Sequence, residues 1–444
     1  MTLEQANKKL AAHGQEHVLA FWKKLSPKSR KALLAQISTI DFNAIDRMRK
    51  MLKEPAKDSA CAKRAEPKAP AVVEFSAKRR ANAYELGEAE LRAGRVAVLL
   101  VAGGQGSRLG YEGPKGAYPI GPLSGAPLFY FHARKILALT ERYETRVPFY
   151  VMTSEVNYEA TVECFESFGY FGLDKKDVIF FKQGMWPALT EDGKIILDRP
   201  DHIFMSPDGH GGTLTALAKN GCLKDMKKRG ITSVFYFQVD NPMVEIADPA
   251  FIGLHVSTGS EFSSKLCAKR DPFEGLGVVV KTGSRFSMIE YSELTKEQAT
   301  RKTDSGDLYF KYGSVAIHVF SLALLEREAA ADMPLHIARK KIPYCDEKGN
   351  VVKPEKPNGC KFEKFIFDML PDAKKVTNLA FDRAEEFSPV KNAEGVDSPE
   401  SCKRDLQAKW RRWMGLPQDS SLPVEIDPAY ALDAEELAEN GIIL

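Results

Sequence analysis

Residues 96–116 read VAVLLVAGGQGSRLGYEGPKG, an apolar run that leads directly into a glycine-rich loop. The run Val96–Val101 has the length and composition of a buried β-strand. Glycines let the backbone approach a ligand closely and turn its N–H groups toward an anion. We therefore predict a phosphate-binding loop in which Arg108 and Lys115 supply positive charge. The alternative is a tight strand-to-helix turn, which needs one glycine and gives these two cations no role. The loop glycines are Gly103, Gly104, Gly106 and Gly110.

Two common nucleotide-binding motifs do not fit this loop. A Walker A loop has the form G-x-x-x-x-G-K-[ST], but here Gly116 follows Lys115 where Ser or Thr is required. A dinucleotide fingerprint G-x-G-x-x-G that starts at Gly104 would need glycine where the chain has Leu109. The second mismatch disfavours a dehydrogenase.

After this loop, short β-rich segments alternate with helical segments. The alternation predicts an α/β domain around a largely parallel sheet. The segment TEDGK at 190–194 predicts a hairpin turn, because Asp-Gly supplies the positive φ angles that such turns need. The expected strands are 95–101, 148–152, 178–181 and 233–239, and the expected helices are 127–140, 156–168 and 212–229.

We divide the chain into three regions. Residues 1–90 form a helical N-terminal region in which the Pro- and Lys-rich stretch 54–71 is a linker or surface excursion. Residues 91–397 form the main domain, and 398–444 form a small C-terminal subdomain. The last region combines a Trp-rich helix, the strand-like VEID at 424–427 and the helical DAEELAENG.

The composition excludes several classes of partner and location. A net charge of +3 over 444 residues gives no field that would draw the protein to nucleic acid or a membrane surface. The apolar runs are too short to span a bilayer, and the start MTLEQANKKL has no secretory signal, so we expect a cytoplasmic protein. The seven cysteines contain no C-x-x-C pair and offer no zinc cage.

A long ordered series of motifs extends over nearly the whole chain. The motifs are GGQGSRLG…PKG, KQGMWPAL, PDGHGG, QVDNP, EYSE, KPNGCKFEKFIFD and EEFSPVKN, with GQEHVLAFW at 14–22 and AENGI near the end. This series resembles the eukaryotic-type UDP-sugar pyrophosphorylase family, in particular UDP-N-acetylhexosamine pyrophosphorylases. The resemblance implies a Rossmann-like nucleotidyltransferase core with a mixed, mostly parallel sheet, a helical N-terminal segment and a small C-terminal subdomain. It also implies that UTP and a sugar 1-phosphate react to give a UDP-sugar and pyrophosphate.

The resemblance assigns roles to residues on the nucleotide side. The glycine loop contacts uridine and phosphate through its backbone, Gln183 reads the uracil edge, and Gly209 packs on the base. Arg108 and Lys115 neutralise the phosphates, and Lys361 and Lys391 match further lysines that contact phosphate. The implied nucleotide-binding residues are Val101, Ala102, Gly103, Gly104, Lys115, Gln183, Gly209, Asp240 and Lys361, and the implied catalytic residues are Arg108, Lys115 and Lys391.

Asp240 follows the apolar run VFYFQV. An acid at the carboxyl end of a buried strand in an open α/β sheet points into the crevice where ligands bind. A carboxylate there suits Mg²⁺, whose charge a triphosphate substrate needs. The alternative is an Asx turn before Asn241-Pro242, which is compatible with metal binding.

The sugar side departs from the hexosamine pattern. The implied sugar contacts are His210, Glu290, Tyr291, Ser314 and Lys391. Where hexosamine enzymes show G-N-I-x-N, residues 313–317 read GSVAI, and His210 replaces an asparagine as in UDP-glucose pyrophosphorylases. N-acetylglucosamine 1-phosphate is the expected acceptor, with Ser314 bonding the acetamide and Ile317 packing on its methyl group. Glucose 1-phosphate stays the alternative.

A different class of function is a sugar-nucleotide-binding regulator without turnover. The joint presence of Arg108, Lys115, Asp240, Lys361 and Lys391 argues against it, because binding alone does not need every charge-neutralising group. The sequence leaves the oligomeric state open, and a monomer is compatible with it.

Overall fold

The computed structural model describes residues 1–54, 66–417 and 419–441. The chain forms two compact units, each assembled from segments that are far apart in the sequence. The small unit combines Met1–Ala65, Gly184–Thr213 and Asp332–Asp368, and the sheet unit combines Glu66–Gln183, Leu214–Ala331 and Met369–Leu444. The division at 1–90, 91–397 and 398–444 stays a prediction, because the grouping of segments into compact units does not show which parts of the chain fold independently.

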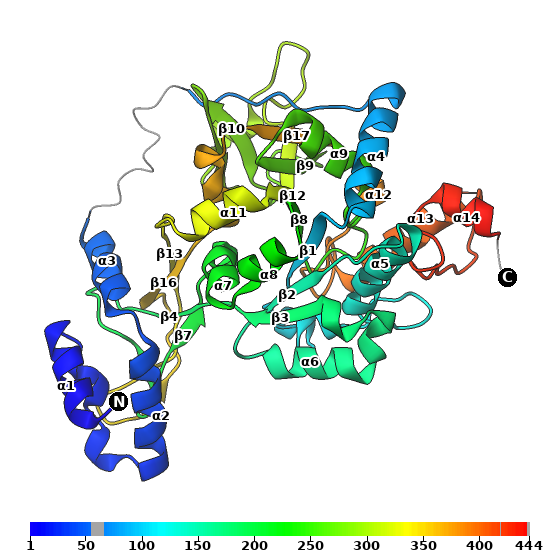
Figure 1. Cartoon of the computed structure of the whole chain (residues 1–444). Coiled ribbons are helices and arrows are strands. Elements are labelled where there is room, and N and C mark those ends of the chain that lie inside the picture. The colour runs from blue at the N-terminus through cyan, green and yellow to red at the C-terminus, as the bar shows by residue number, and fades with distance from the viewer. Residues whose placement is uncertain (55–65, 418, 442–444) are drawn as a thin grey trace. The chain divides into compact units, whose positions relative to one another are not determined.

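The sheet unit is built on a seven-stranded sheet of order β17-β9-β12-β8-β1-β2-β3 (Figure 1). Its strands are β1 (Val96–Val101), β2 (Phe149–Thr153), β3 (Val178–Lys182), β8 (Ser233–Gln238), β9 (Phe262–Ala268), β12 (Tyr312–Ser321) and β17 (Val376–Ala380). The strands β8, β1, β2 and β3 run parallel, whereas β12 is antiparallel to both of its neighbours. The predicted mixed, mostly parallel sheet is therefore confirmed, as are all four predicted strands.

Strand β1 is an interior strand of this sheet, between β8 and β2. It pairs Val98 with Phe149 of β2 on one side and Val96 with Ser233 of β8 on the other. The residues Val96–Leu100 are all buried, as expected for a parallel strand that is covered on both faces. The uninterrupted apolar run made this strand recognisable from the sequence.

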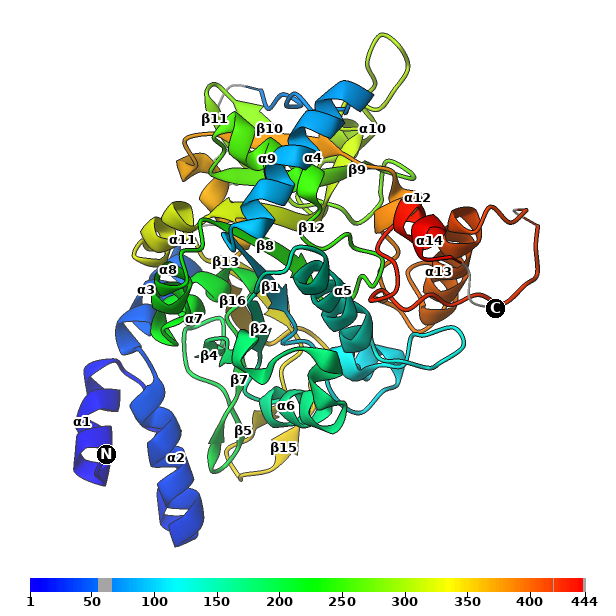
Figure 2. The same cartoon turned by 45° about the vertical axis from the view of Figure 1, so that its right-hand side comes forward.

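Helices accompany the sheet, and two of them meet backbone to backbone. A Cβ atom on Gly87 would lie 1.8 Å from the carbonyl oxygen of Pro249, and one on Gly253 would lie 1.7 Å from that of Ala83. Glycine is therefore required at both positions for α4 and α9 to lie side by side (Figures 1 and 2). The helices are α4 (Ala77–Arg92), α5 (Leu128–Arg142), α6 (Tyr158–Ser167), α7 (Thr213–Lys219), α8 (Cys222–Lys228), α9 (Pro249–Thr258), α10 (Lys296–Thr300), α11 (Leu322–Ala329), α12 (Arg383–Glu386), α13 (Pro399–Trp413) and α14 (Ala434–Asn440).

The predicted helices at 127–140 and 156–168 are confirmed as α5 and α6. The single helix predicted over 212–229 is wrong. Gly221 has a φ of +77°, a left-handed conformation that ends α7 before α8 begins.

The C-terminal region contains both predicted helices, α13 and α14, but the segment VEID is not a strand. Its acidic side chains bind other parts of the sheet unit instead. Glu425 accepts the backbone N–H groups of Leu123 and Ser124 at 2.7 and 3.0 Å. Asp427 pairs with Arg134 at 2.6 Å. The apolar and acidic residues alternate here because the acidic side chains anchor a loop, not because the segment forms a strand.

The small unit packs helices on short antiparallel hairpins. Its apolar core includes Leu33 and Ile37 of the helices and Ile195 and Phe362 of the later segments. The elements are α1 (Leu3–Ala12), α2 (Pro27–Thr39), α3 (Phe42–Lys53) and the paired strands β4 (Met185–Pro187) with β7 (Met205–Pro207), β5 (Leu197–Arg199) with β6 (His202–Ile203), β13 (His336–Lys340) with β16 (Gly359–Glu363), and β14 (Tyr344–Cys345) with β15 (Val351–Val352).

The hairpin turn predicted at 190–194 is confirmed. The N–H group of Thr190 donates to the carbonyl of Lys194 at 2.8 Å, and Gly193 has a φ of +81°. Of the predicted linker, residues 55–65 lie outside the described residues, and Lys68 exchanges backbone hydrogen bonds with Lys281.

The remaining elements are a hairpin and several short turns. The hairpin joins β10 (Val278–Thr282) to β11 (Arg285–Ile289). Within the described part of the chain, no helix has the length and apolar character to cross a bilayer. The 3₁₀ turns are η1 (Glu16–Leu19), η2 (Trp22–Lys24), η3 (Ser107–Leu109), η4 (Lys115–Ala117), η5 (Gly169–Gly172), η6 (Lys175–Asp177), η7 (His210–Gly212) and η8 (Ile366–Asp372).

Candidate active site

Hydrogen bonds fix the glycine loop at the end of β1. The N–H group of Ala102 donates to the carbonyl of Met152 at 2.8 Å, and that of Lys115 donates to the carbonyl of Gly104 at 3.0 Å. The buried amide of Asn157 donates to the carbonyls of Ala102 and Gly104 at 2.9 and 3.2 Å. A Cβ atom on Gly104 would meet nothing within 4 Å, so this side of the loop is accessible to a ligand.

Gln183 lies against the same loop. A Cβ atom on Gly103 would fall 2.5 Å from Oε1 of Gln183, so the glutamine side chain packs on the glycine backbone. The backbone N–H of Gln183 donates to the carbonyl of Thr153 at 2.8 Å, and only 9% of the residue is exposed. The structure thus brings Gln183 together with the loop Val101–Gly104, as the predicted nucleotide site requires.

The rest of the loop folds back through η3 and η4. The N–H group of Gly106 donates to the carbonyl of Gly113 at 2.9 Å. A Cβ atom on Gly116 would lie 2.1 Å from the ring of Phe129, so the residue after Lys115 must be glycine. These contacts leave Arg108 on an exposed turn and hold Lys115 in a half-buried position.

Charged residues from distant segments meet at Lys115. Burial lowers the pKa of Lys115, the carboxylate of Asp240 raises it, and the positive charges of Lys391 and Arg108 lower it further. Coulomb interactions between exposed charges are screened beyond about 10 Å at ordinary salt. The fold therefore gathers these four predicted site residues into one cluster beside the glycine loop.

Backbone contacts place Asp240 and Lys391 next to each other. Asp240 follows β8, the parallel neighbour of β1, so both strands deliver their ends to the same edge of the sheet. The N–H group of Val390 donates to the carbonyl of Asp240 at 2.8 Å, and that of Lys391 donates to the carbonyl of Asp397 at 2.7 Å. The Lys391 Nζ lies 5.6 Å from the centroid of the Phe387 ring.

Three predicted sugar contacts surround the segment Gly275–Gly277. The N–H group of Ser314 donates to the carbonyl of Gly277 at 2.8 Å. A Cβ atom on Gly277 would lie 3.4 Å from Oε1 of Glu290, and one on Gly275 would lie 3.9 Å from the ring of Tyr291. Tyr291 is 54% exposed. The structure therefore brings Ser314, Glu290 and Tyr291 together.

A β-bulge shapes β12 after Ser314. The pairing with β9 shifts between Ser314 and Ile317, and Ala316 has a φ of +59°. Ile317 is 1% exposed and belongs to the apolar core of the sheet unit. The expectation that Ile317 packs on an acetamide methyl group is wrong, because the bulge turns its side chain into the core.

Gly209 and His210 belong to the small unit. Gly209 has a φ of +82°, and a Cβ atom there would lie 2.5 Å from the carbonyl oxygen of Lys364. The His210 ring stacks on Phe365 at 5.3 Å, and its Nδ1 accepts the backbone N–H of Ile366 at 3.2 Å. Burial, assisted by the nearby His336, lowers the pKa of His210 to about 4. His210 is therefore neutral at neutral pH, and the bond to Nδ1 leaves its proton on Nε2.

Lys361 lies on β16 of the small unit, opposite Ala338 of β13. Its Nζ is 5.1 Å from the centroid of the Phe204 ring. Burial lowers the pKa of Lys361, while Glu363 raises it and Lys340 lowers it. A partly desolvated lysine of this kind is suited to an anionic ligand.

A sequence profile described as UTP–glucose-1-phosphate uridylyltransferase matches residues 45–401, which is most of the chain. The chain belongs to this uridylyltransferase family. The resemblance drawn from the motifs is thereby confirmed, and with it the assignment to the nucleotidyltransferases.

Relatives of this uridylyltransferase are similar over nearly their full length. The UDP-N-acetylhexosamine pyrophosphorylase-like protein 1 of Homo sapiens is 39% identical, and the match covers 95% of this chain and 89% of the human protein. The UDP-N-acetylglucosamine pyrophosphorylase of Saccharomyces cerevisiae is 34% identical, and the match covers 96% of this chain and 94% of the yeast protein. The crystal structure of the uridine diphosphate N-acetylglucosamine pyrophosphorylase from Trypanosoma brucei has a TM-score of 0.85 and 29% identity over 98% of this chain and 94% of that chain.

The uridylyltransferase has an acidic cluster apart from Asp240. Among the described residues, the carboxylates that lie close enough to share a metal ion are those of Glu245, Asp248 and Glu386. However, the Nζ of Lys265 lies 2.5 Å from Glu386 and 2.8 Å from Asp248. An ammonium group therefore already occupies the position that a cation would take. The half-buried carboxylate of Asp240 instead fits Mg²⁺, which proteins commonly bind through one or two carboxylates and substrate phosphates.

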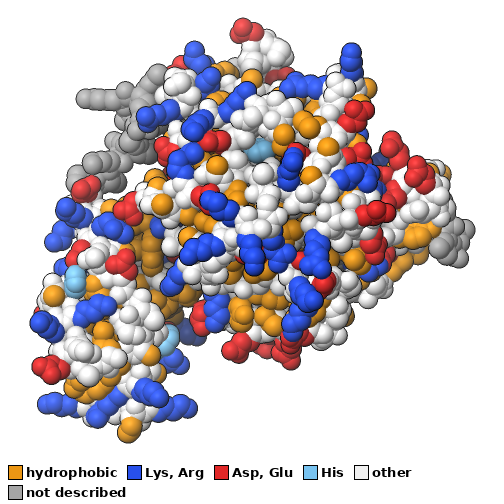
Figure 3. Space-filling model, in the orientation of Figure 1, with side chains coloured by type: hydrophobic (Ala, Val, Ile, Leu, Met, Phe, Trp, Pro, Cys, Tyr) orange, Lys and Arg blue, Asp and Glu red, His pale blue; other side chains and the backbone are white. Residues whose placement is uncertain are grey.

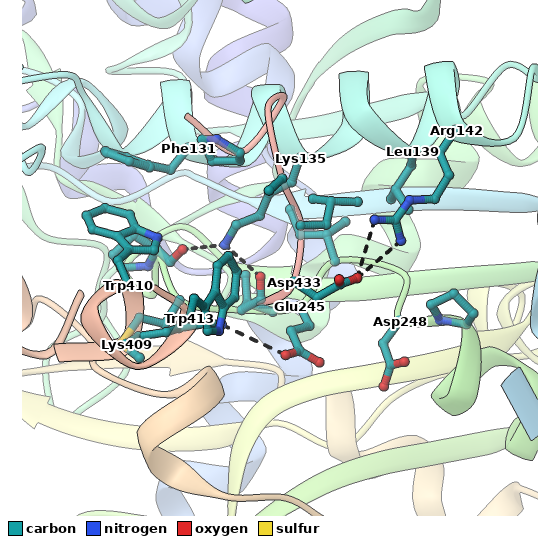
Figure 4. Close-up of a pocket in the computed structure, with 18 of the residues that line it drawn as sticks. Phe131, Lys135, Leu139, Arg142, Glu245, Asp248, Lys409, Trp410, Trp413 and Asp433 are labelled. Atoms are coloured by element: carbon teal, nitrogen blue, oxygen red, sulfur yellow. Dashed lines mark hydrogen bonds and ion pairs between the residues drawn. The ribbon is translucent and has the colours of Figure 1, made fainter. Parts of the chain in front are cut away.

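A pocket of about 90 Å³ lies against α5 and α13 (Figure 4). Phe131, Trp410 and Trp413 give it an aromatic lining, and Lys135 and Glu245 add charge. None of the predicted site residues of the uridylyltransferase lines it.

Exposed positive charge on this uridylyltransferase is concentrated elsewhere. Figure 3 shows Lys and Arg side chains gathered over α8, where Lys224, Lys227 and Lys228 are exposed. These residues belong to no predicted site. Of the cations in the cluster at the candidate site, Lys115 and Lys391 are half-buried and Arg108 is exposed.

Sequence reasoning missed Asn157, which shapes the glycine loop, and Asn241, which binds the segment before Lys391. Asn157 follows β2 in the pattern Ser154-x-x-Asn157, and its Oδ1 accepts the N–H of Ser154 at 2.8 Å. A cap motif after a strand that neighbours β1 was the available signal. Asn241 was visible only as part of a possible Asx turn.

Proposed function

We propose that this chain transfers the uridylyl group of UTP to a sugar 1-phosphate, giving a UDP-sugar and pyrophosphate. The observation that carries this proposal is the cluster of Lys115, Asp240, Lys391 and Arg108 beside an accessible glycine loop. Relatives named as pyrophosphorylases support it. Two polyanionic substrates repel each other, and such a cluster lowers that repulsion.

In this reaction an oxygen of the sugar phosphate attacks the α-phosphorus of UTP. A new P–O bond forms there, and the bond from the α-phosphorus to the bridging oxygen breaks. The electron pair of that bond leaves with pyrophosphate. Because the attacking phosphate is already ionised at neutral pH, no general base is required, and positioning and charge neutralisation carry the rate.

Lys115 is proposed to stabilise charge at the α-phosphate, and Arg108 to stabilise the departing pyrophosphate. The partial burial that lowers the pKa of Lys115 also strengthens its interaction with an anion, because less water screens it. Lys391 is proposed to bind the sugar phosphate and Lys361 to contact phosphate. Asp240 would hold Mg²⁺, which when bound supplies positive charge to the triphosphate.

Uracil recognition is proposed for Gln183 together with the backbone of Val101–Gly104 and Gly209. The amide of Gln183 offers a donor and an acceptor, which match the edge of a base. Its contact with Gly103 restrains the side chain, and a restrained hydrogen-bonding group discriminates better than a mobile one.

N-acetylglucosamine 1-phosphate is proposed as the acceptor, with His210, Glu290, Tyr291 and Ser314 as sugar contacts. Relatives carrying that sugar in their names support this choice. The second candidate is glucose 1-phosphate, which the histidine at 210 and the absence of asparagine from 313–317 favour. A third, from another class, is a regulator that binds sugar nucleotides without turnover.

Pyrophosphate release from UTP separates these candidates. The assay is run in parallel with the 1-phosphates of glucose, galactose, N-acetylglucosamine and N-acetylgalactosamine. We expect the highest kcat/KM with N-acetylglucosamine 1-phosphate. A tenfold higher value for glucose 1-phosphate, about 1.4 kcal/mol in transition-state binding, would reverse the choice of sugar. No release with any acceptor would favour the regulator.

The proposal extends to the setting of the reaction. UTP and a sugar 1-phosphate are its small-molecule partners, with no role for nucleic acid or a membrane. We propose a cytoplasmic enzyme, for which a monomer is the plausible oligomeric state.

A further inference from the structure

Asn241 links the turn after β8 to the segment that carries Lys391. Its Nδ2 donates to the carbonyl of Glu386 at 2.7 Å, and its Oδ1 accepts the N–H of Ser388 at 3.2 Å. Only 5% of Asn241 is exposed. Both ends of this buried amide are therefore used to bind one short stretch of backbone just before Lys391.

Lys265 holds the same stretch through the Glu386 side chain. Lys265 is 1% exposed, and its Nζ contacts Glu386 at 2.5 Å and Asp248 at 2.8 Å. Burial lowers the pKa of Lys265, but Asp248, Glu386 and Glu245 raise it by more, so the ammonium stays charged. Glu386 is thus bound at its side chain by Lys265 and at its carbonyl by Asn241.

The amino groups of two more buried lysines donate to backbone carbonyls of these segments. Lys135 donates to the carbonyls of Pro242 and Val244, the latter at 2.8 Å, and so fixes the turn that follows Asp240 (Figure 4). Lys409 donates to the carbonyl of Glu385 at 2.6 Å. Buried lysines therefore anchor both the turn after Asp240 and the segment before Lys391.

We propose that Asn241 and Lys265 are positioning residues that hold Lys391 beside Asp240 and Lys115 during uridylyl transfer. This inference rests on the proposed function. Neither residue needs to touch a substrate, because each acts through the backbone at 386–390. A shift of about 1 Å in a charged group can cost on the order of 100-fold in rate, so such anchoring has a kinetic consequence.

A double-mutant cycle with Lys391 tests the proposal. Asn241→Ala and Lys265→Met are each measured in the wild-type chain and in Lys391→Ala. In the wild-type background each should lower kcat by on the order of tenfold or more, with KM for UTP within about twofold. In Lys391→Ala the same substitutions should lower kcat by less than about twofold, because the group they position is already gone.

Asn378→Ala is the matched control. Asn378 is a buried asparagine of β17, 2% exposed, in the same unit. Its loss should leave kcat within about twofold of wild type. Additive effects of Asn241→Ala and Lys391→Ala, or an equal loss of kcat in Asn378→Ala, would overturn the proposal.

Hydrogen exchange gives a reading that does not depend on activity or on the fate of Lys265→Met. In Asn241→Ala the amides of Ser388 and Val390 should exchange at least about tenfold faster, while those of β1 stay protected. Glu386→Gln, which keeps the shape of the side chain, replaces Lys265→Met if that variant does not fold. Unchanged exchange at Ser388 and Val390 would contradict the positioning role. Absent turnover in the wild-type chain would instead contradict the proposed function.

Discussion

The regions of the sheet unit proposed to bind the nucleotide (the nucleotide side) and the sugar (the sugar side) are built in different ways. The glycine loop continues the interior strand β1, and its carbonyls accept hydrogen bonds from Asn157 and from the backbone of Lys115. Glu290 and Tyr291 instead follow β11, in a hairpin outside the main sheet, and Tyr291 is 54% exposed. The first region is thus joined to the main sheet through β1 and these hydrogen bonds, whereas Glu290 and Tyr291 lie beside a separate two-stranded hairpin.

This contrast indicates which changes the fold tolerates. Under the proposed mechanism, every sugar 1-phosphate needs the same phosphoryl chemistry, so the charged cluster at Lys115 has to keep its geometry. Recognition of the sugar can change at positions that do not belong to that cluster. The departures from the hexosamine pattern fall at such positions, in residues 313–317 of β12 and at His210 of the small unit.

Of the substitutions at the candidate site, Lys115→Ala should cause the largest loss of catalytic activity. Removing one preorganised charge from the transition state lowers kcat by at least about 100-fold. Steady-state pyrophosphate release measures this, with the exposed Lys219→Ala on α7 as the control. Turnover of Lys115→Ala within threefold of wild type would remove Lys115 from the mechanism.

Asp240→Asn should lower activity by between about 10- and 100-fold at limiting Mg²⁺, because it weakens a metal ligand and leaves the backbone in place. Raising the Mg²⁺ concentration should restore part of the loss. The check is an Mg²⁺ titration of both proteins. If the two titration curves coincide, Asp240 is not a metal ligand.

Gln183→Ala should narrow the preference for UTP over CTP by about tenfold, because a buried hydrogen-bonding group that selects one base is lost. The measurement is kcat/KM for each nucleotide at a fixed sugar 1-phosphate concentration. An unchanged ratio would assign base reading to the backbone of Val101–Gly104.

Tyr291→Ser should affect only the sugar side. We expect KM for the sugar 1-phosphate to rise about threefold, the size of a net hydrogen bond or a partial ring contact. KM for UTP should not change. An equal rise in both constants would show that the hairpin also supports the nucleotide side.

Of these substitutions, His210→Gln should change the kinetics least, and its effect should appear in how protein stability depends on pH. Its folded-state pKa of about 4 lies below the ordinary 6.5, so the unfolded chain takes up this proton first as the pH falls. Stability from His210 is therefore complete above pH 6.5 and is lost as the pH falls toward 4. His210→Gln should flatten the pH dependence of urea unfolding between those values.

In the pH 6 to 9 range the kcat/KM profile of His210→Gln should keep its shape within about twofold, because His210 is neutral throughout. The disappearance of a wild-type inflection near pH 6.5 would mean that His210 titrates in the working enzyme.

The sequence was sufficient for elements that have a local signature. β1 was found from its uninterrupted apolar run, and Asp240 was assigned to the ligand crevice because it follows a buried strand. The resemblance to the pyrophosphorylase family, rather than local pattern, placed Lys115 in the same site. Gly221 was missed, because the apolar pattern continues across the break in the helix. VEID at 424–427 was wrongly predicted as a strand, because acidic side chains that anchor a loop produce the same alternation of apolar and polar residues.

The supports of the site could not be predicted in this way. Asn241 and Lys265 bind Glu386 and Ser388, more than 100 residues later in the chain. Nothing near either residue in the sequence indicates that partner. Such contacts exist only once the chain has folded, so residues that act through them are invisible to motif reading.

The discontinuous small unit also affects how the protein is made. Its core combines Leu33 and Ile37 with Ile195 and Phe362, so the apolar faces of the first helices leave the ribosome long before the later members of the core do. At about 5 to 20 residues per second, the delay is on the order of tens of seconds. During synthesis, the apolar faces of these helices are therefore incompletely covered until the later segments of the core have been made.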